Sequence, residues 1–86
     1  SVKGVEVAVL FRQTAATEYK ISMRSKGRVD LSGLAQALGG GGHKNAAGGF
    51  VKGPLDEVVP RVVNEVGKTV ATQLGGENGN PDERRP

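Results

Sequence analysis

The sequence contains no cysteine and no tryptophan, and its only aromatic residues are Phe11, Tyr19 and Phe50. Without thiols the chain can form neither a disulfide framework nor a thiolate metal site, and a reducing compartment is the simplest expectation. With so few large rings, the core has to be built mainly from valine, leucine, isoleucine and alanine. A chain of 86 residues buries only about 60% of its unfolded surface, so that core is small.

Long apolar runs are also absent. No stretch approaches the roughly 20 residues of a membrane span, and the first residues do not have the pattern of a signal peptide. We therefore expect a cytoplasmic protein without membrane contact. The start at a serine favours a piece of a longer protein. Residues 75–86 carry no apolar side chain beyond two prolines, which predicts one domain over 1–74 and a disordered tail over 75–86.

The formal net charge is +3, and its distribution is uneven. Four cations lie between residues 20 and 28 with no acid among them: Lys20, Arg24, Lys26 and Arg28. Such a cluster is typical of a surface that binds nucleic acid, and equally of a solvated strand end and loop. Charge alone does not separate the two.

Two stretches alternate between apolar and polar residues with period two. They are VEVAVLF at 5–11 and EYKISMR at 18–24, and the short polar segment between them predicts an antiparallel hairpin. The first stretch is apolar on much of both faces, which favours a central strand. The second has a polar face that carries Ser22 and Arg24.

A short helix should follow the hairpin. The segment VDLSGLAQALG at 29–39 has helical spacing, with Asp30 as a candidate N-cap and Gly39 suited to the left-handed position after the last turn. GGFVKG at 48–53 then predicts a short strand with Phe50 buried, added beside the hairpin.

A longer amphipathic helix is predicted from Pro54 to residue 74, where valines and leucines recur three and four residues apart. Pro60 either kinks this helix or moves its start to about residue 57. The resulting order, β-β-α-β-α, predicts a small α+β domain with the helices on one face of a mainly antiparallel sheet.

The segment GGGGHKNAAG at 39–48 places four glycines directly before the only histidine. Four successive glycines have no evident packing value and are costly to order, so a flexible connector is one interpretation. The other is that the run exposes backbone N–H groups to a phosphate or another anion. A single helical turn over HKNAA would aim further N–H groups at the same place, with His43 and Lys44 at its mouth.

Elsewhere the chain offers no catalytic or metal-ligating set. Its acids are scattered, its serines lack a triad, and the glycine run does not end in the Gly-Lys-Ser/Thr of a Walker motif. We therefore expect no metal site and no catalytic residue here. The sequence indicates a module that binds an anionic ligand.

Residues 21–50, ISMRSKGRVDLSGLAQALGGGGHKNAAGGF, closely resemble the C-terminal DHH-associated domain of the DHH-family phosphoesterases. The resemblance is strongest to the bacterial branch of oligoribonucleases and 3′-phosphoadenosine 5′-phosphate (pAp) phosphatases, which is related to the RecJ-like exonucleases. It extends over about residues 5–74. Its specific parts are Arg24-Ser25 at a strand end, Val29-Asp30 before the helix, and GGGGH followed by Ala-Gly.

The resemblance implies a two-lobe hydrolase of which this chain is the substrate-binding lobe. An N-terminal DHH catalytic lobe would hold two Mn²⁺ ions, and this chain would grip the phosphate or terminal nucleotide of short RNA or pAp. The residues implied in substrate binding are Arg24, Ser25, Gly40, Gly41, Gly42 and His43, with Lys44 and Asn45 as weaker candidates. Because the Asp-His-His triplet is missing here, this chain would not hydrolyse anything alone.

Two related classes stay open. A lobe of a cyclic-dinucleotide phosphodiesterase would have a similar domain, and so would a tRNA-binding module of an alanyl-tRNA synthetase-like protein. GGGGH with Asn45-Ala46-Ala47-Gly48 fits the phosphoesterase form better than the synthetase form.

Overall fold

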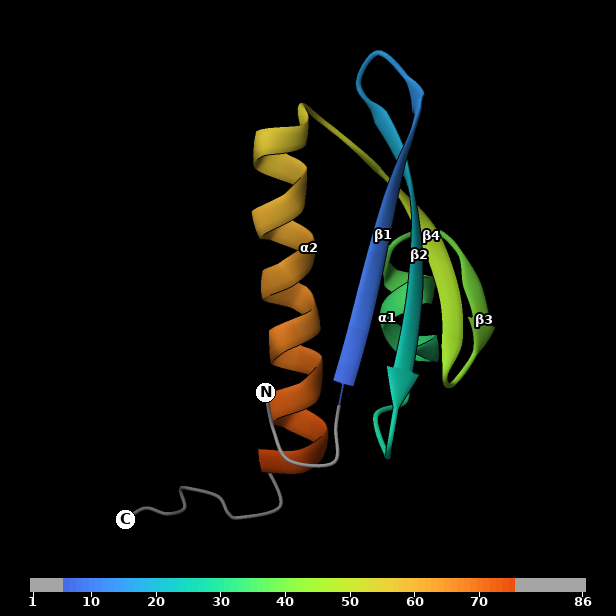
Figure 1. Ribbon diagram of the computed structural model, residues 1–86, viewed down its shortest axis with the longest axis vertical. Coiled ribbons are helices and arrows are strands. Elements are labelled where there is room, and N and C mark those ends of the chain that lie inside the picture. The colour runs from blue at the N-terminus through green and yellow to red at the C-terminus, as the bar shows by residue number, and fades with distance from the viewer. Residues whose placement is uncertain (1–5, 76–86) are drawn as a thin grey trace.

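The computed structural model describes residues 6–75, which form a four-stranded antiparallel sheet and two α-helices (Figure 1). The strand order is β1-β2-β4-β3. The elements are β1 (Glu6–Ala15), β2 (Glu18–Lys26), α1 (Ser32–Ala37), β3 (Gly41–His43), β4 (Ala46–Lys52), α2 (Leu55–Val70) and a π-helical turn (Ala71–Gly75). The expected α+β fold is confirmed, with one strand more than we predicted. Nearly all of the expected tail, 76–86, lies outside the described residues.

The additional strand is β3, which forms inside the glycine-rich run. Lys44 and Asn45 make a tight turn that joins it to β4, and His43 lies opposite Ala46. The helical turn that we expected over HKNAA is therefore wrong. A two-residue connection between paired antiparallel strands leaves no room for one.

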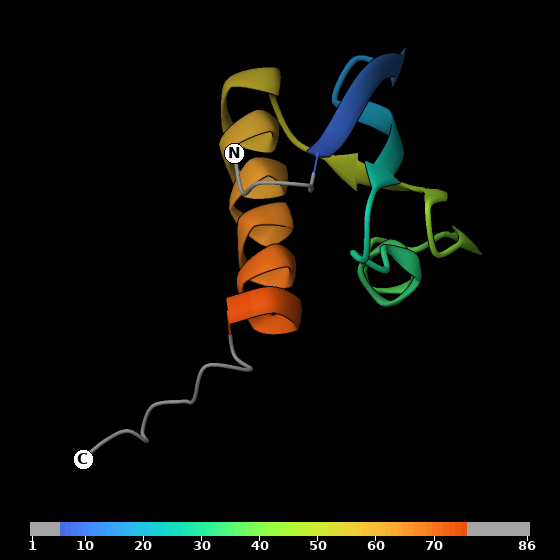
Figure 2. The same cartoon turned by 60° about the horizontal axis from the view of Figure 1, so that its bottom comes forward.

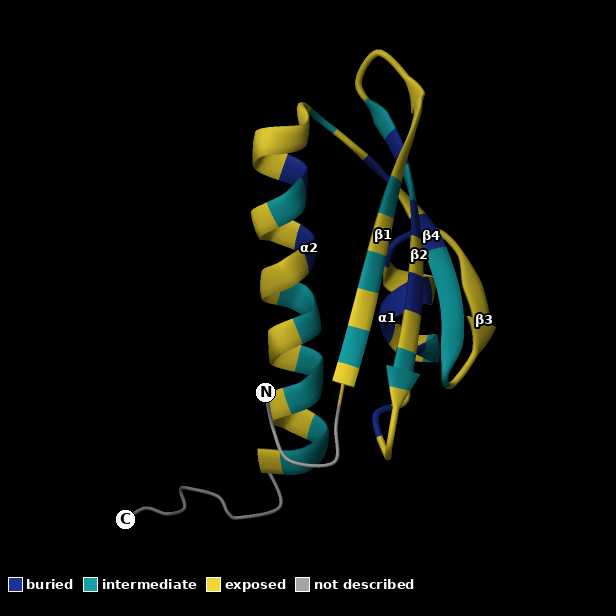
Figure 3. Cartoon of the chain, in the orientation of Figure 1, coloured by how far each residue is buried: buried dark blue, intermediate teal, exposed yellow. Residues whose placement is uncertain are grey.

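β1 lies at the edge of the described sheet (Figure 1). Our prediction of a central position for this strand is therefore wrong. Val7, Val9 and Phe11 are half-buried against the core, while Leu10 on the other face is 68% exposed. Half-buried and exposed residues alternate along the strand in Figure 3. Apolar residues on both faces were a poor guide to position because only one face of this sheet is covered by helices.

The core lies between one sheet face and the two helices. It is built from odd-numbered residues of β2 and β4 (Tyr19, Ile21, Met23, Val51), from the segment leading into α1 and α1 itself (Val29, Leu31, Leu34, Ala35, Leu38), and from α2 (Val58, Val62). Phe50, which we expected in this core, is 50% exposed. Since neighbouring strand residues point to opposite faces, the burial of Val51 places Phe50 on the other side.

α2 begins at Leu55 and runs through Pro60, so the alternative start near residue 57 is wrong. Only part of its expected apolar face is covered. Val58 and Val62 are fully buried, whereas Val63 is 55% exposed. The C-terminal half of α2 lies alongside α1 (Figure 2). Within residues 6–75, neither helix combines the length and the apolar character needed to cross a membrane.

α1 is short, and the first two glycines of the run follow its C-cap residue, Leu38. Its N-cap position is Leu31, one residue later than we expected, and the Asp30 carboxylate instead accepts hydrogen bonds from the N–H and hydroxyl of Ser32 at 2.9 and 2.6 Å. Gly39 follows the helix with φ +78°, as predicted. These bonds and this left-handed glycine fix where the chain enters and leaves α1.

Candidate functional site

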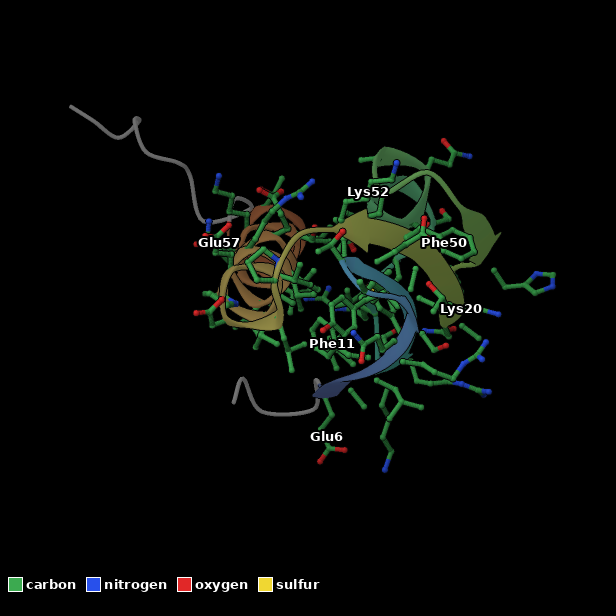
Figure 4. The ribbon with its side chains drawn as sticks, turned by 90° about the horizontal axis from the view of Figure 1, so that it is seen from above. Glu6, Phe11, Lys20, Phe50, Lys52 and Glu57 are labelled. Carbon is green, nitrogen blue, oxygen red and sulfur yellow. The ribbon has the colours of Figure 1, made fainter. Side chains whose placement is uncertain are left out.

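The open face of the sheet, meaning the face turned away from the helices, carries the even-numbered residues of β1, β2 and β4. Figure 4 shows Lys20 and Phe50 on the side of the sheet opposite α2. Cross-strand partners share a face, so the register defines rows across this surface. The three central rows are Ala8, Arg24, Ala46 and His43; Leu10, Ser22, Gly48 and Gly41; and Arg12, Lys20 and Phe50.

Arg24 and His43 share one of these rows. Arg24 on β2 and His43 on β3 both lie opposite Ala46 of β4, from its two sides, and both are exposed. Two strand spacings separate their backbones by about 10 Å. The side chains of an arginine and a histidine at this separation can reach the same small anionic ligand.

The neighbouring row has little side-chain bulk from β2 to β3, and Leu10 of β1 lies at its far end. Gly41 and Gly48 contribute backbone only, and Ser22 adds a hydroxymethyl group. Arg24 and His43 border this row on one side, and Phe50 with Lys20 borders it on the other. A ligand lying there would touch backbone directly, with Arg24 and His43 at one margin and Phe50 and Lys20 at the other.

The structure requires glycine at some positions of the run and not at others. Our interpretation that the four glycines have no packing value is therefore wrong for part of the run. A Cβ on Gly40 would lie 2.0 Å from the carbonyl oxygen of Gly48, and Gly42 has φ +141° with a Cβ position 2.7 Å from the Ala46 oxygen. A Cβ on Gly41 would meet nothing within 4 Å, and its φ is not in the left-handed region. Sterics therefore do not explain Gly41.

The expected row of unshielded N–H groups is not formed. The N–H of Gly39 bonds the Gln36 oxygen at 3.0 Å, and that of Gly40 bonds the Ala35 oxygen at 2.8 Å. Gly41 to His43 then pair with β4 as a strand. The glycines therefore follow the end of α1 and allow β3 to lie close to β4. The surface above them consists of backbone atoms without side chains.

Ser25 and Asn45 form a hydrogen-bond network next to Arg24 and His43. The Asn45 side-chain amide donates to Ser25 Oγ at 2.8 Å and to the Val29 oxygen at 3.4 Å, and Ser25 Oγ donates to the same oxygen at 2.8 Å. The N–H of Leu31 also bonds the Lys44 oxygen at 2.7 Å. These bonds tie the turn after His43 to the end of the strand that carries Arg24.

The remaining cations of the segment lie around the site. Lys26 and Lys44 are exposed at the end of β2 and in the turn. Hydrogen bonds from the side chain and then the backbone of Ser32 lower the pKa of Asp30 below its ordinary 3.8, and the charge of Lys44 acts in the same direction. Asp30 therefore stays a carboxylate that holds the start of α1.

Two surface hollows lie on the described part of the chain. The larger, of about 590 Å³, lies between the start of α1 and the end of α2, where none of the expected site residues lies. The second, of about 430 Å³, is lined by Arg24, Ser25, Lys26 and the start of β1, but not by His43. The row shared by Arg24 and His43 is thus an open surface and not an enclosed pocket.

Phe50, Lys20 and Arg12 were missing from the residues that the sequence assigned to the site. The signal that could have found Phe50 was the alternation along β4, since one of Phe50 and Val51 had to face outward. Within residues 6–75, no three His, Asp or Glu side chains gather as a potential metal site.

The comparisons with known proteins give the family of this chain. A model of the DHHA1 domain matches residues 1–72. The chain belongs to the DHHA1 family. It is also similar to the bifunctional oligoribonuclease and PAP phosphatase NrnA of Thermus thermophilus, with 42% identity over 66 residues that make up 76% of this chain. This DHHA1 chain spans only 20% of the length of that relative.

Proposed function

We propose that this DHHA1 domain is the substrate-binding lobe of a phosphoesterase that hydrolyses short oligoribonucleotides or pAp. The observation that carries the proposal is the row shared by Arg24 and His43 on the uncovered sheet face. The two activities in the name of the Thermus relative support this substrate class. The domain would hold and orient the substrate, and a DHH catalytic lobe of the same protein would supply the hydrolysis.

Each open-face residue has a role that its chemistry supports. The Arg24 guanidinium would pair with two oxygens of a phosphate, and a ring N–H of His43 would donate to the same group. The missing side chain at Gly41 would let the ligand reach the backbone. Phe50 would stack on a base, a contact worth about 1–3 kcal/mol. Ser25 and Asn45 would position the turn without touching substrate.

The two Mn²⁺ ions that the resemblance implies do not fit the described part of this chain. Residues 6–75 hold no cluster of three His, Asp or Glu side chains. In the proposed arrangement the ions belong to the catalytic lobe, where they would activate water and stabilise phosphate charge. Binding and orientation are the contributions we assign to this chain.

A binding experiment with the isolated chain tests the proposal. We expect adenosine 3′,5′-bisphosphate or a short oligoribonucleotide to shift the NMR signals of Arg24, Gly41, His43 and Phe50. Binding should weaken with added salt because phosphate contacts displace ions. Arg24→Ala should weaken binding by about tenfold or more, since a hydrogen bond to a charged group contributes roughly 1.5–3 kcal/mol.

Arg61→Ala is the matched control, because Arg61 is an exposed arginine on α2, away from the open face. It should leave binding unchanged. Shifts confined to α2, or equal losses in both variants, would contradict the proposed site. A cyclic dinucleotide bound more tightly than the linear ligands would keep the site and change the substrate class.

A further inference from the structure

β1 presents an unpaired backbone edge among the described residues. At the two ends of the β2–β4 ladder, the N–H of Ser25 bonds the Asn45 oxygen, and the N–H of Gly53 bonds the Thr17 oxygen. Odd-numbered residues of β2 therefore bond to β4, and its even-numbered residues bond to β1. By the same alternation, the N–H and C=O groups of Val7, Val9 and Phe11 point outward from β1.

Nothing in the rest of the described chain covers these groups with a backbone partner. The backbone hydrogen bonds of residues 6–75 that lie outside the helices and ladders involve no residue from 6 to 13. The bulge of this hairpin lies between Gln13 and Ala15, so Glu6 to Arg12 form a regular edge without proline. Such edges are the places where proteins add another strand.

The side chains along this edge complement themselves in the antiparallel direction. If two copies of β1 pair around Val9, Glu6 faces Arg12, Val7 faces Phe11 and Ala8 faces Leu10. Each apolar residue then meets an apolar residue, and each charge meets its opposite at both ends. The core-facing and open-face residues of the two sheets also continue on their own sides.

Other registers that keep the two faces continuous lose this match. Pairing around Ala8 places Glu6 against Leu10, and pairing around Leu10 places Arg12 against Ala8. Within one chain, Arg12 lies opposite Lys20 on β2, a pairing of like charges that is unfavourable. Glu6 of a second copy would offset it.

We propose that β1 pairs with β1 of a second copy of this chain, antiparallel and centred on Val9, to form a continuous eight-stranded sheet. Leu10, which is 68% exposed in the single chain, becomes covered in part by Ala8 of the other copy. The contact is smaller than a standard protein interface, so the association is weak and concentration-dependent. It lies on a different edge from β3 and leaves His43 accessible.

Sedimentation velocity of the chain from micromolar to millimolar concentration tests the pairing. Glu6→Arg and Arg12→Glu should each weaken self-association by about tenfold, because each places like charges at both ends of the paired strands. The double variant should restore it. An equal mixture of the two single variants should form a mixed dimer, since each supplies the charges that the other has lost.

Lys52→Glu is the control, because Lys52 is an exposed cation on the same face but on β4, two strands away from the edge. Circular dichroism melting identifies any variant that fails to fold, and slowed amide exchange at Val7, Val9 and Phe11 at high concentration reports the pairing directly. A chain that stays monomeric at millimolar concentration overturns the proposal. So does a dimer that neither charge reversal weakens.

Discussion

Gly40 and Gly41 are adjacent, yet the structure places opposite demands on them. The position of a Cβ on Gly40 is occupied by the Gly48 carbonyl at 2.0 Å, and the same position on Gly41 is open. One glycine is required for folding. The other is free to differ as far as folding is concerned, and it lies in the row beside Arg24 and His43.

We expect Gly40→Ala to destabilise the chain by more than about 3 kcal/mol or to prevent folding, because backbone atoms would have to separate. Gly41→Ala should change the free energy of unfolding by less than about 1 kcal/mol. If the open face binds nucleotides, Gly41→Ala should nevertheless weaken that binding. Urea unfolding and ligand titration of both variants measure the two effects, and equal destabilisation would contradict this interpretation.

The sequence indicated the glycine run as a candidate site, but it did not show which of its glycines the fold requires. The constraints on Gly40 and Gly42 come from β4, whose residues become neighbours only after the chain folds. Arg24 and His43 were predicted as substrate-binding residues from the family motif, and that role stays a prediction. Phe50 was misplaced because the choice between it and Val51 depends on which sheet face the helices cover.

At the scale of the elements, the turn between β3 and β4 is held by a partly buried network of side-chain hydrogen bonds. The Asn45 amide bonds Ser25 Oγ at 2.8 Å and the Val29 oxygen at 3.4 Å, and both Asn45 and Ser25 are partly buried. This support joins the hairpin that carries His43 to the strand that carries Arg24. Lys44, the other turn residue, is exposed.

Asn45→Ala should destabilise the chain by about 1–3 kcal/mol, because it leaves the partly buried Ser25 Oγ without its donor and removes one of the two donors to the Val29 oxygen. Lys44→Ala is the matched control in the same turn and should change stability by less than about 0.5 kcal/mol. Urea unfolding compares the two. Similar values would mean that the amide network does not support the turn.

The helices and strands that follow a periodic pattern of apolar residues could be predicted from the sequence. The hairpin of β1 and β2, the short α1 and the long α2 all followed from spacing, because each buries one face of a regular pattern. β3 could not be found that way. Gly41, Gly42 and His43 have no strand preference, and they form a strand because the tight turn folds them back onto β4.

At the scale of the whole molecule, the side-chain amide of one residue links the end of the second helix to the segment before the first. Gln73, in the π-helical turn after α2, accepts the N–H of Asp30 and donates to its C=O, both at 2.7 Å. The partners are 43 residues apart. The turn after α2 is thereby fixed to the segment that enters α1.

Gln73→Ala should remove this link, lower stability by about 0.5–1.5 kcal/mol and speed amide exchange at Asp30. Thr72→Ala, an exposed neighbour in the same turn, should do neither. Hydrogen exchange with thermal unfolding measures both. If exchange at Asp30 were unchanged, the end of α2 would be held by apolar packing alone.

Along β2 and β4, neighbouring residues alternate between the packed core and the exposed face of the sheet. Ile21, Met23 and Val51 fill the core, while Lys20, Ser22, Arg24 and Phe50 lie between or beside them on the uncovered face. Substitution at the second set alters the exposed surface and leaves the packed layer intact. The exposed side chains can therefore change one at a time without disturbing the core, whereas inserting or deleting one residue in either strand would exchange the two sets and expose the core residues.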